Sequence, residues 1–136
     1  MAQPQLAALG SIYRVPSKGY VVFIKVIYQS LIFKELVLLR VFERRFPIGV
    51  DVSEDLPTLP SRCIYTGMGT IRAKKWDQAG TEPVTDAEAQ MSLRTVARDV
   101  WLGDSLLRPA SDEDMKRLPK MLVYGANLVE LEIGKA

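Results

Sequence analysis

The chain contains no histidine, and its only cysteine is Cys63. Histidine is the commonest general base and metal ligand in proteins, so its absence removes the usual basis for acid–base catalysis and transition-metal binding. A single cysteine excludes a disulfide bond within the chain. Nothing in the sequence activates Cys63, so we expect it to be a small buried side chain. We therefore expect no catalytic residue, no metal site and no cofactor.

A marked excess of charge of either sign is also missing. Lysine and arginine number 18 and aspartate and glutamate 16, which gives a net charge of +2. This balance argues against nucleic acid as a partner. Basic residues outnumber acidic ones in residues 1–76, and the reverse holds in residues 77–114. The asymmetry indicates either two mutually attracting halves of one domain or an acidic surface that meets a basic partner.

The sequence has no uninterrupted apolar run that could span a membrane. Its most apolar stretch, residues 20–42, is interrupted by Lys25, Lys34, Glu35 and Arg40, whereas a spanning helix needs ~20 residues with few charges. The first ten residues lack the basic and apolar regions of a secretory signal. We expect a cytoplasmic protein that does not associate with membranes, in keeping with its free thiol.

Segments rich in β-branched and aromatic residues dominate the first half of the chain and predict strands. Residues 11–16, 20–28 and 34–42 are separated by short turns, which predicts an antiparallel meander covered on both faces. The loop at residues 47–60 holds three prolines and has room for one helical turn. Two further strands, residues 63–66 and 70–76, are expected to pair across a turn at Gly67-Met68-Gly69.

The second half of the chain predicts short elements of both kinds. We expect a turn at residues 77–80, a short helix from Thr85 with Glu88 in a capping box, and strands at 98–102 and 106–108. Residues 111–118 form the clearest helix, because Ser111 can cap it, acids occupy its first turn and Pro119 follows it. Residues 127–133 alternate apolar and acidic side chains, which favours a closing strand over a last helical turn.

These elements predict one α+β domain over residues 1–136. It is expected to consist mainly of a curved, barrel-like antiparallel sheet with one or two short helices. The sequence does not indicate an oligomeric state.

Several short motifs follow one another in an order that resembles the Immunity protein 26 family of bacterial polymorphic-toxin systems. They are the opening strand Gly10-Ser-Ile-Tyr-Arg-Val-Pro16, Trp76 before the turn that ends at Pro83, the helix start Ser111-Asp-Glu113, Leu118-Pro119, and Gly125-Ala126 before Leu128-Val129-Glu130. The resemblance extends over nearly the whole chain. It implies a non-catalytic inhibitor that binds and neutralises a cognate toxin or effector protein and so protects the producing cell.

Residues that contact such a partner have no family motif, so we chose candidates from the chain itself. Polar loops are free to recognise a partner, and toxins that act on nucleic acid or anionic lipid tend to have basic surfaces, which acidic residues would complement. The candidate partner-binding residues are Asp51, Glu54, Asp55, Asp77, Glu82, Asp86 and Glu88. The next candidates are Arg44, Arg45, Lys74, Lys75 and Trp76.

Two other classes of function remain open on the sequence alone. A small SH3-like β-barrel adaptor could bind nucleic acid or another ligand through the basic doublets and nearby aromatic residues. An enzyme would need two carboxylates that converge in one cleft, and no motif singles out such a pair.

Overall fold

The computed structural model describes residues 8–136. The strands in this range are β1 (Ser11–Ser17), β2 (Tyr20–Gln29), β3 (Leu36–Phe42), β4 (Ser61–Gly67), β5 (Asp77–Thr81), β6 (Leu93–Val96), β7 (Asp99–Leu102), β8 (Ser105–Pro109) and β9 (Val123–Tyr124). The helices are α1 (Met68–Lys74), α2 (Asp86–Gln90), α3 (Asp112–Arg117) and α4 (Ala126–Ile133), with a short 3-10 helix, η2, at Leu56–Thr58.

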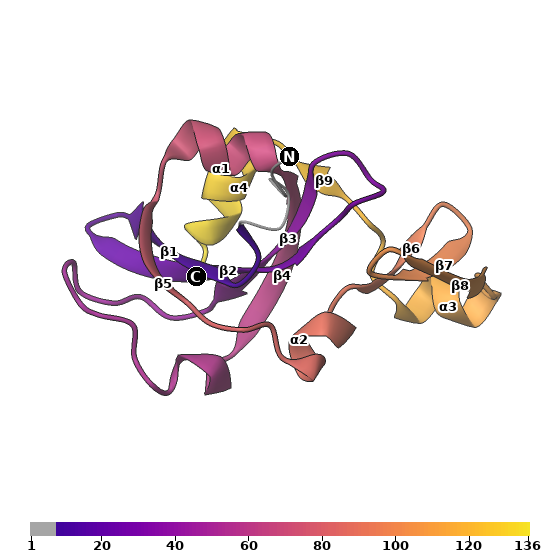
Figure 1. Cartoon of the computed structure of the whole chain (residues 1–136), viewed down its shortest axis with the longest axis horizontal. Helices are drawn as coiled ribbons and strands as arrows, with labels where there is room; N and C mark the ends of the chain where they lie inside the picture. Colours follow the sequence, from indigo (N-terminus) through magenta and orange to yellow (C-terminus); the bar gives the residue numbers. More distant parts are fainter. Residues whose placement is uncertain (1–7) are drawn as a thin grey trace, which may run out of the picture.

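The strands form two sheets that lie next to each other (Figure 1). The main sheet has the order β5-β1-β2-β3-β4-β9, and the smaller sheet has the order β6-β7-β8. Within the main sheet all pairs are antiparallel except β4 with β9. The prediction of an α+β fold built mainly on antiparallel sheet is confirmed.

The predicted meander of the first three strands is also confirmed. β1, β2 and β3 pair in chain order, and β4 continues the sheet. Every residue of β3 is buried, and Tyr20 is the one exposed residue of β2. These two central strands are therefore covered on both faces, as their nearly continuous apolar sequence indicates.

The barrel-like part of the prediction is wrong, because the main sheet does not close. Its edge strands, β5 and β9, stand at opposite ends of the strand order and do not pair. One face of the sheet is instead covered by α1 and α4 (Figure 1). With α2 and α3, the described residues form four helices rather than the expected one or two.

The helix-covered face of the main sheet holds the largest apolar cluster. The strands contribute alternate residues such as Ile24, Leu39 and Ile64, while the helices contribute Ile71 and Val129 among others. Ion pairs between Arg62 and Glu132 and between Lys74 and Glu130 attach α4 to β4 and α1.

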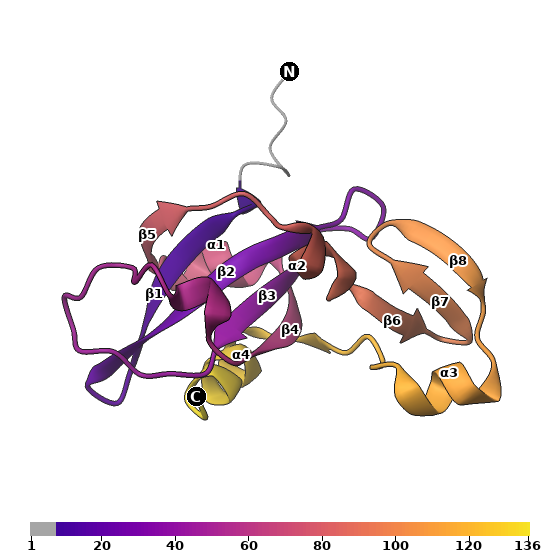
Figure 2. The same cartoon turned by 90° about the horizontal axis from the view of Figure 1, so that it is seen from below.

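The opposite face is covered by the loop of residues 47–60 and by α2 (Figure 2). Phe23, Phe42 and Phe46 pack there with Leu56 of η2. The expected helical turn in this loop is therefore present. Two buried charged residues, Lys25 of β2 and Arg40 of β3, also lie on this face.

Three predicted elements of the middle and end of the chain are wrong. Of residues 70–76, expected as a strand, the first five belong to α1, and residues 77–80, expected as a turn, belong to β5. Residues 127–133 lie in α4, which buries Val129 and Ile133. These two residues are four positions apart, so the apolar pattern fits one face of a helix as well as a strand, and packing against β4 and α1 decides.

The two capped helices are confirmed, each with a complete capping box. Thr85 caps α2 with Glu88, and Ser111 caps α3 with Asp114. Strand β7 and the short strand β8 also lie close to their predicted positions. Among the described residues, no helix combines the length and apolar character that crossing a membrane would require.

Candidate functional site

Two loops that are distant in sequence meet over the same face of the main sheet and line a pocket that is partly open to solvent. Residues 52–57 of the first loop and residues 82–88 of the second line a cavity of about 290 Å³. The sheet beneath them contributes Ile12, Lys25, Arg40 and Phe42. Apolar side chains therefore form much of the wall, and charged side chains lie at both the floor and the rim.

The floor of the pocket contains two cations that the strand register places side by side. Lys25 of β2 and Arg40 of β3 lie directly opposite each other in the antiparallel pair, and like charges in that position are destabilising. Their exposed fractions are 5% and 7%. A buried pair of this kind needs a counterion from another element.

Glu88 of α2 provides that counterion. Its Oε1 lies 2.7 Å from Lys25 Nζ and its Oε2 lies 2.8 Å from Arg40 NH1. The side chain is almost fully buried, at 2% exposure. Lys25, Arg40 and Glu88 together are called the buried triad below.

Other polar groups complete the surroundings of the buried triad. Lys25 Nζ also donates to the carbonyl of Pro83 at 3.0 Å. Arg40 donates through Nε to Ser61 Oγ and through NH2 to the carbonyl of Pro57, each at 2.9 Å. The two cations therefore tie the sheet to both loops as well as to α2.

The carboxyl group of Glu88 stays ionised despite its position. Burial alone would raise its pKa, but hydrogen bonds from Lys25 and Arg40, the backbone N–H of Thr85 and the charge of Lys25 together lower it below the ordinary value. The buried triad consequently holds two positive charges and one negative charge.

The expectation that Glu88 lies on a free surface is wrong. Glu88 occupies the third position of α2, where the capping box with Thr85 turns its side chain back toward the helix start. That orientation also places the carboxylate over Lys25 and Arg40. A residue chosen as a partner contact is thus part of the protein interior.

The other six predicted contact residues are exposed and fall into two groups on this side of the molecule. Glu54 and Glu82 stand at the rim of the pocket, and Asp86 is exposed at the start of α2. The remaining three pair with arginines at the surface: Asp51 and Asp77 with Arg14, and Asp55 with Arg44.

Reasoning from the sequence missed Lys25 and Arg40 as site residues. Both are single charges within strands that are expected to be buried on both faces. Since a buried charge is paired or costly, such an isolated cation indicates a buried anion from elsewhere in the chain. The sequence therefore predicts a buried ion pair at these two positions, but it does not indicate which acidic residue supplies the carboxylate.

The second set of basic candidates does not form one surface. Trp76 is buried in the core beneath α1 and α4, and Lys74 pairs with Glu130. Arg45 donates to the carbonyls of Gly134 and Ala136 near the end of the chain. These contacts account for the three residues as parts of the scaffold.

Cys63 lies at the surface, contrary to the expectation that it is buried. Its side chain is on the same face of β4 as Tyr65, and its Sγ lies 4.0 Å from Met91 Sδ. Partial burial raises the pKa of the thiol to about 11, so the thiol stays protonated and weakly nucleophilic near neutral pH. Within residues 8–136 no group of three histidine, cysteine or acidic side chains could hold a metal ion.

A third buried cation lies at the junction of the two sheets. Arg94 of β6 has no exposed surface, and its guanidinium lies between 5.3 and 5.6 Å from the ring centres of Tyr28, Phe33 and Tyr65. NH1 donates to the carbonyls of Ser92 and Gly103. Nε and NH2 have no hydrogen-bond partner among the residues that the structure describes.

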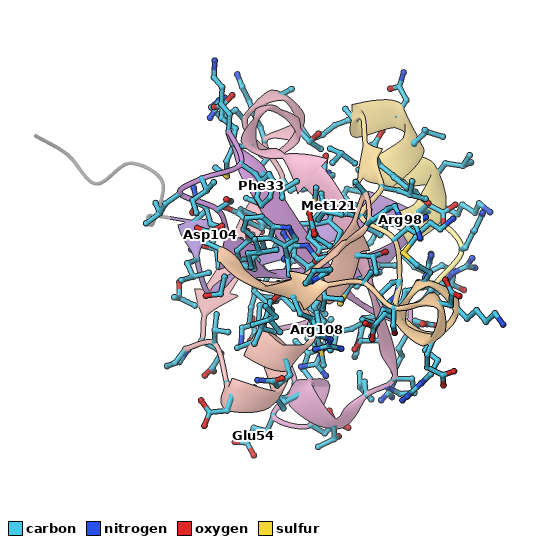
Figure 3. All side chains as sticks on the ribbon, turned by 90° about the vertical axis from the view of Figure 1, so that its right-hand side faces the viewer. Phe33, Glu54, Arg98, Asp104, Arg108 and Met121 are labelled. Carbon is cyan, nitrogen blue, oxygen red and sulfur yellow. The ribbon has the colours of Figure 1, made fainter. Side chains whose placement is uncertain are left out.

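Asp104, in the turn between β7 and β8, follows Gly103, whose carbonyl accepts a hydrogen bond from Arg94. Its carboxylate accepts hydrogen bonds from Tyr28 Oη at 2.5 Å, Ser30 Oγ at 2.6 Å and the backbone N–H of Leu31 at 2.8 Å. In Figure 3, Phe33 and Asp104 are labelled toward one end of the small sheet, and Arg98 at the other end. These contacts join the small sheet to the end of β2, so we assign Arg94 and Asp104 to the scaffold.

Comparison of the chain with protein-family models, with curated proteins and with solved structures finds no match.

Proposed function

We propose that this chain is a cytoplasmic immunity protein, a non-catalytic inhibitor that neutralises a cognate toxin by one-to-one binding. The observation that supports this best is the meeting of two acidic loops over one face of the main sheet. Recognition residues concentrate on loops that a rigid scaffold positions. The order of motifs that resembles the Immunity protein 26 family points to the same function.

Two acids at the pocket rim and one at the start of α2 have charge available for a partner. Among residues 8–136, the ion pairs leave Glu54, Glu82 and Asp86 without a cation within 4 Å. All three are exposed. A basic patch on a toxin would complement them and would be attracted over a distance of about a Debye length, ~8–10 Å at physiological salt.

The first acidic loop is held on the sheet by buried contacts. Leu56 is 1% exposed, and the carbonyl of the adjacent Pro57 accepts a hydrogen bond from Arg40. A loop fixed in this way loses little further freedom on binding, which favours affinity.

The second acidic loop is fixed at both ends. Glu88 anchors its helical end, and the N–H of Glu82 donates to the carbonyl of Gly10 at 3.0 Å. Gly10 has a φ of +85°, and a Cβ atom there would lie 2.6 Å from the carbonyl oxygen of Glu82. Only glycine allows this close approach, so Gly10 sets the position of the loop.

The proposal is tested by protection. Where a large protein is encoded next to this chain, its C-terminal domain is the toxin candidate, and that domain is expressed with and without the chain in a sensitive host. We expect the chain to restore growth and to form a one-to-one complex with that domain. Growth arrest that persists despite abundant chain would overturn the proposal.

The position of the interface is tested on the same pair of proteins. Glu54→Lys with Glu82→Lys reverses the rim charge and should slow association about tenfold at low salt, and less at moderate salt. Glu43→Lys with Glu113→Lys is the matched control, because these acids are exposed and do not line the pocket. Equal slowing by both double variants would place the interface elsewhere.

A further inference from the structure

The pocket beneath the acidic rim has features of a ligand site that toxin binding does not require. We propose that it binds a small organic carboxylate with an apolar body, whose carboxylate is received by Lys25 and Arg40. This inference is independent of the proposed inhibitory function, since it concerns the chain alone. Three observations carry it: the charge of the buried triad, its spare hydrogen-bond donors and the apolar wall.

The first observation is an excess of buried positive charge. Lys25, Arg40 and Glu88 are each at least nine-tenths buried, and they comprise two cations and one anion. Among residues 8–136, Glu88 is the only carboxylate within 4 Å of either cation. An uncompensated charge in a poorly hydrated site is costly, and a bound anion would remove that cost.

The second observation concerns hydrogen bonds. The carboxylate of Glu88 can accept few more, whereas Lys25 and Arg40 still have unused N–H donors. Oε1 of Glu88 already accepts from Lys25 Nζ and from the N–H of Thr85, and Oε2 accepts from Arg40. The ammonium of Lys25 uses two of its three donors, for Glu88 and Pro83. Arg40 uses three of its five, for Ser61, Glu88 and Pro57.

Both cations line the pocket, so these spare donors are close to its interior. A carboxylate has two acceptor oxygens that suit such a set of charged donors. The site therefore offers one further anionic group, beside Glu88, hydrogen-bond donors from both a lysine and an arginine.

The third observation is the apolar wall around the charged floor. Ile12, Phe42, Val52, Leu56 and Pro83 contribute to it. The cavity of about 290 Å³ lies just below the usual range of ligand pockets, roughly 300–1,000 Å³, so its ligand must be small. A small aryl or alkyl group would fill it and bury apolar surface, which an inorganic anion could not do.

The acidic rim restricts which anions enter. Glu54 lies at the outer edge of the molecule in Figure 3 and is exposed, so water and salt screen its charge from the floor of the pocket. The same is expected of Glu82, which is also exposed. Repulsion from these two acids grows with ligand charge, so the rim favours a carboxylate over a phosphate dianion.

The decisive experiment compares ligands of the same shape and different charge on the wild-type protein. Phenylpropionate, phenylpropanamide and phenylpropylamine are titrated into the chain by calorimetry and by NMR. We expect the carboxylate to bind about tenfold more tightly than the amide, with shifts at Lys25, Arg40 and Phe42, and the amine to bind most weakly. Equal affinities of carboxylate and amide, or no binding of the carboxylate, would overturn the proposal.

Variants of the buried triad then test whether its charge excess is the cause. Lys25→Met leaves one cation with Glu88 and should remove the preference for the carboxylate. Glu88→Gln leaves two cations and should tighten carboxylate binding several-fold, while glutamine still completes the capping box with Thr85. Unchanged carboxylate affinity in folded Lys25→Met, or weaker binding by folded Glu88→Gln, would contradict the proposal.

Lys34→Met is the matched control for the lysine variant. It makes the same chemical change at an exposed residue that does not line the pocket, and it should bind all three ligands as the wild type does. If Lys25→Met fails to fold, the comparison of ligands on the wild-type chain still decides the question. Because no toxin is present in these titrations, their outcome is separate from that of the protection assay.

Discussion

Individual buried charges are the residues on which this structure depends most. The buried triad holds α2 against the main sheet, and Arg94 with Asp104 holds the small sheet against the end of β2. Each cluster binds together segments that are far apart in the chain. Removing one member leaves its partners buried without their charge partner, which costs more than the loss of a surface ion pair.

Asp104 should make stability depend on acid pH. Burial alone would raise its pKa, but hydrogen bonds from Ser30, Tyr28 and Leu31 and the charge of Arg94 lower it below the ordinary value of 3.8. Because the pKa of Asp104 is lower in the folded chain than in the unfolded chain, this carboxyl group binds more protons in the unfolded chain around that pH. The stabilisation by Asp104 is therefore complete above pH 3.8 and is lost as the pH falls through the lower folded value.

The measurement is urea unfolding of the wild type and of Asp104→Asn between neutral and acid pH. We expect the wild type to be more stable near neutrality and the difference between the two to shrink as the pH falls below about 4. Glu88 is present in both proteins, so its contribution cancels when their free energies of unfolding are subtracted. The pH dependence of that difference therefore reports on Asp104. A difference that stays constant over this range would contradict the assignment.

At the scale of elements, α4 shows how one apolar pattern permits two structures. In a strand, Val129, Leu131 and Ile133 would share one face, because side chains alternate. In α4, Val129 and Ile133 are fully buried, whereas Leu131 is 61% exposed. The helical arrangement thus divides three residues that the strand interpretation would group together.

This division is tested by two alanine substitutions on the same helix. Ile133→Ala should lower the free energy of unfolding by about 2–5 kcal/mol, because it empties a packed site. Leu131→Ala removes a side chain of the same size from the surface and should change it by less than about 0.5 kcal/mol. Denaturant unfolding measures both, and similar losses for the two variants would favour a strand at this position.

At the scale of the whole molecule, the two sheets are joined by few contacts. Arg94 lies among three aromatic rings that belong to the main-sheet side, and Phe33 packs edge-on against Trp101 of β7 with ring centres 5.0 Å apart. The elements with few buried apolar contacts are the first to open locally. The small sheet, in which every residue of β8 is exposed, is such a region.

Arg94→Met should therefore release the small sheet before the main sheet. It removes the charge among the rings and leaves the carbonyl of Gly103 without its donor, while methionine keeps much of the apolar stem. Hydrogen exchange monitored by NMR should speed up in β6, β7 and β8 and change little in β2 and β3. Arg98→Met, a change at an exposed residue in the turn between β6 and β7, is the control and should leave both sheets unaffected. Uniform acceleration across both sheets would contradict a separable junction.

Local signals in the sequence were sufficient for much of the fold. The β-branched runs specified β1, β2 and β3, and the cap residues Thr85 and Ser111 marked the starts of α2 and α3. Both signals act within a few residues: side chains that crowd the backbone favour extended structure, and a hydroxyl satisfies free N–H groups at a helix start. The lack of histidine and of a second cysteine excluded histidine-based catalysis and a disulfide bond within the chain without any structural information.

The tertiary structure alone decided α1, β5, α4 and the pocket. The apolar residues of α1 and α4 fit two periodicities, and packing on the sheet selected the helix. Glu54, Glu82 and Lys25 share one pocket because two loops fold over one face of the sheet. Lys25 meets Arg40 because of the register of β2 on β3, and a shift of one residue would turn either side chain to the other face. Such register and long-range contacts depend on the sum of packing over the whole sheet, which no local stretch of sequence contains.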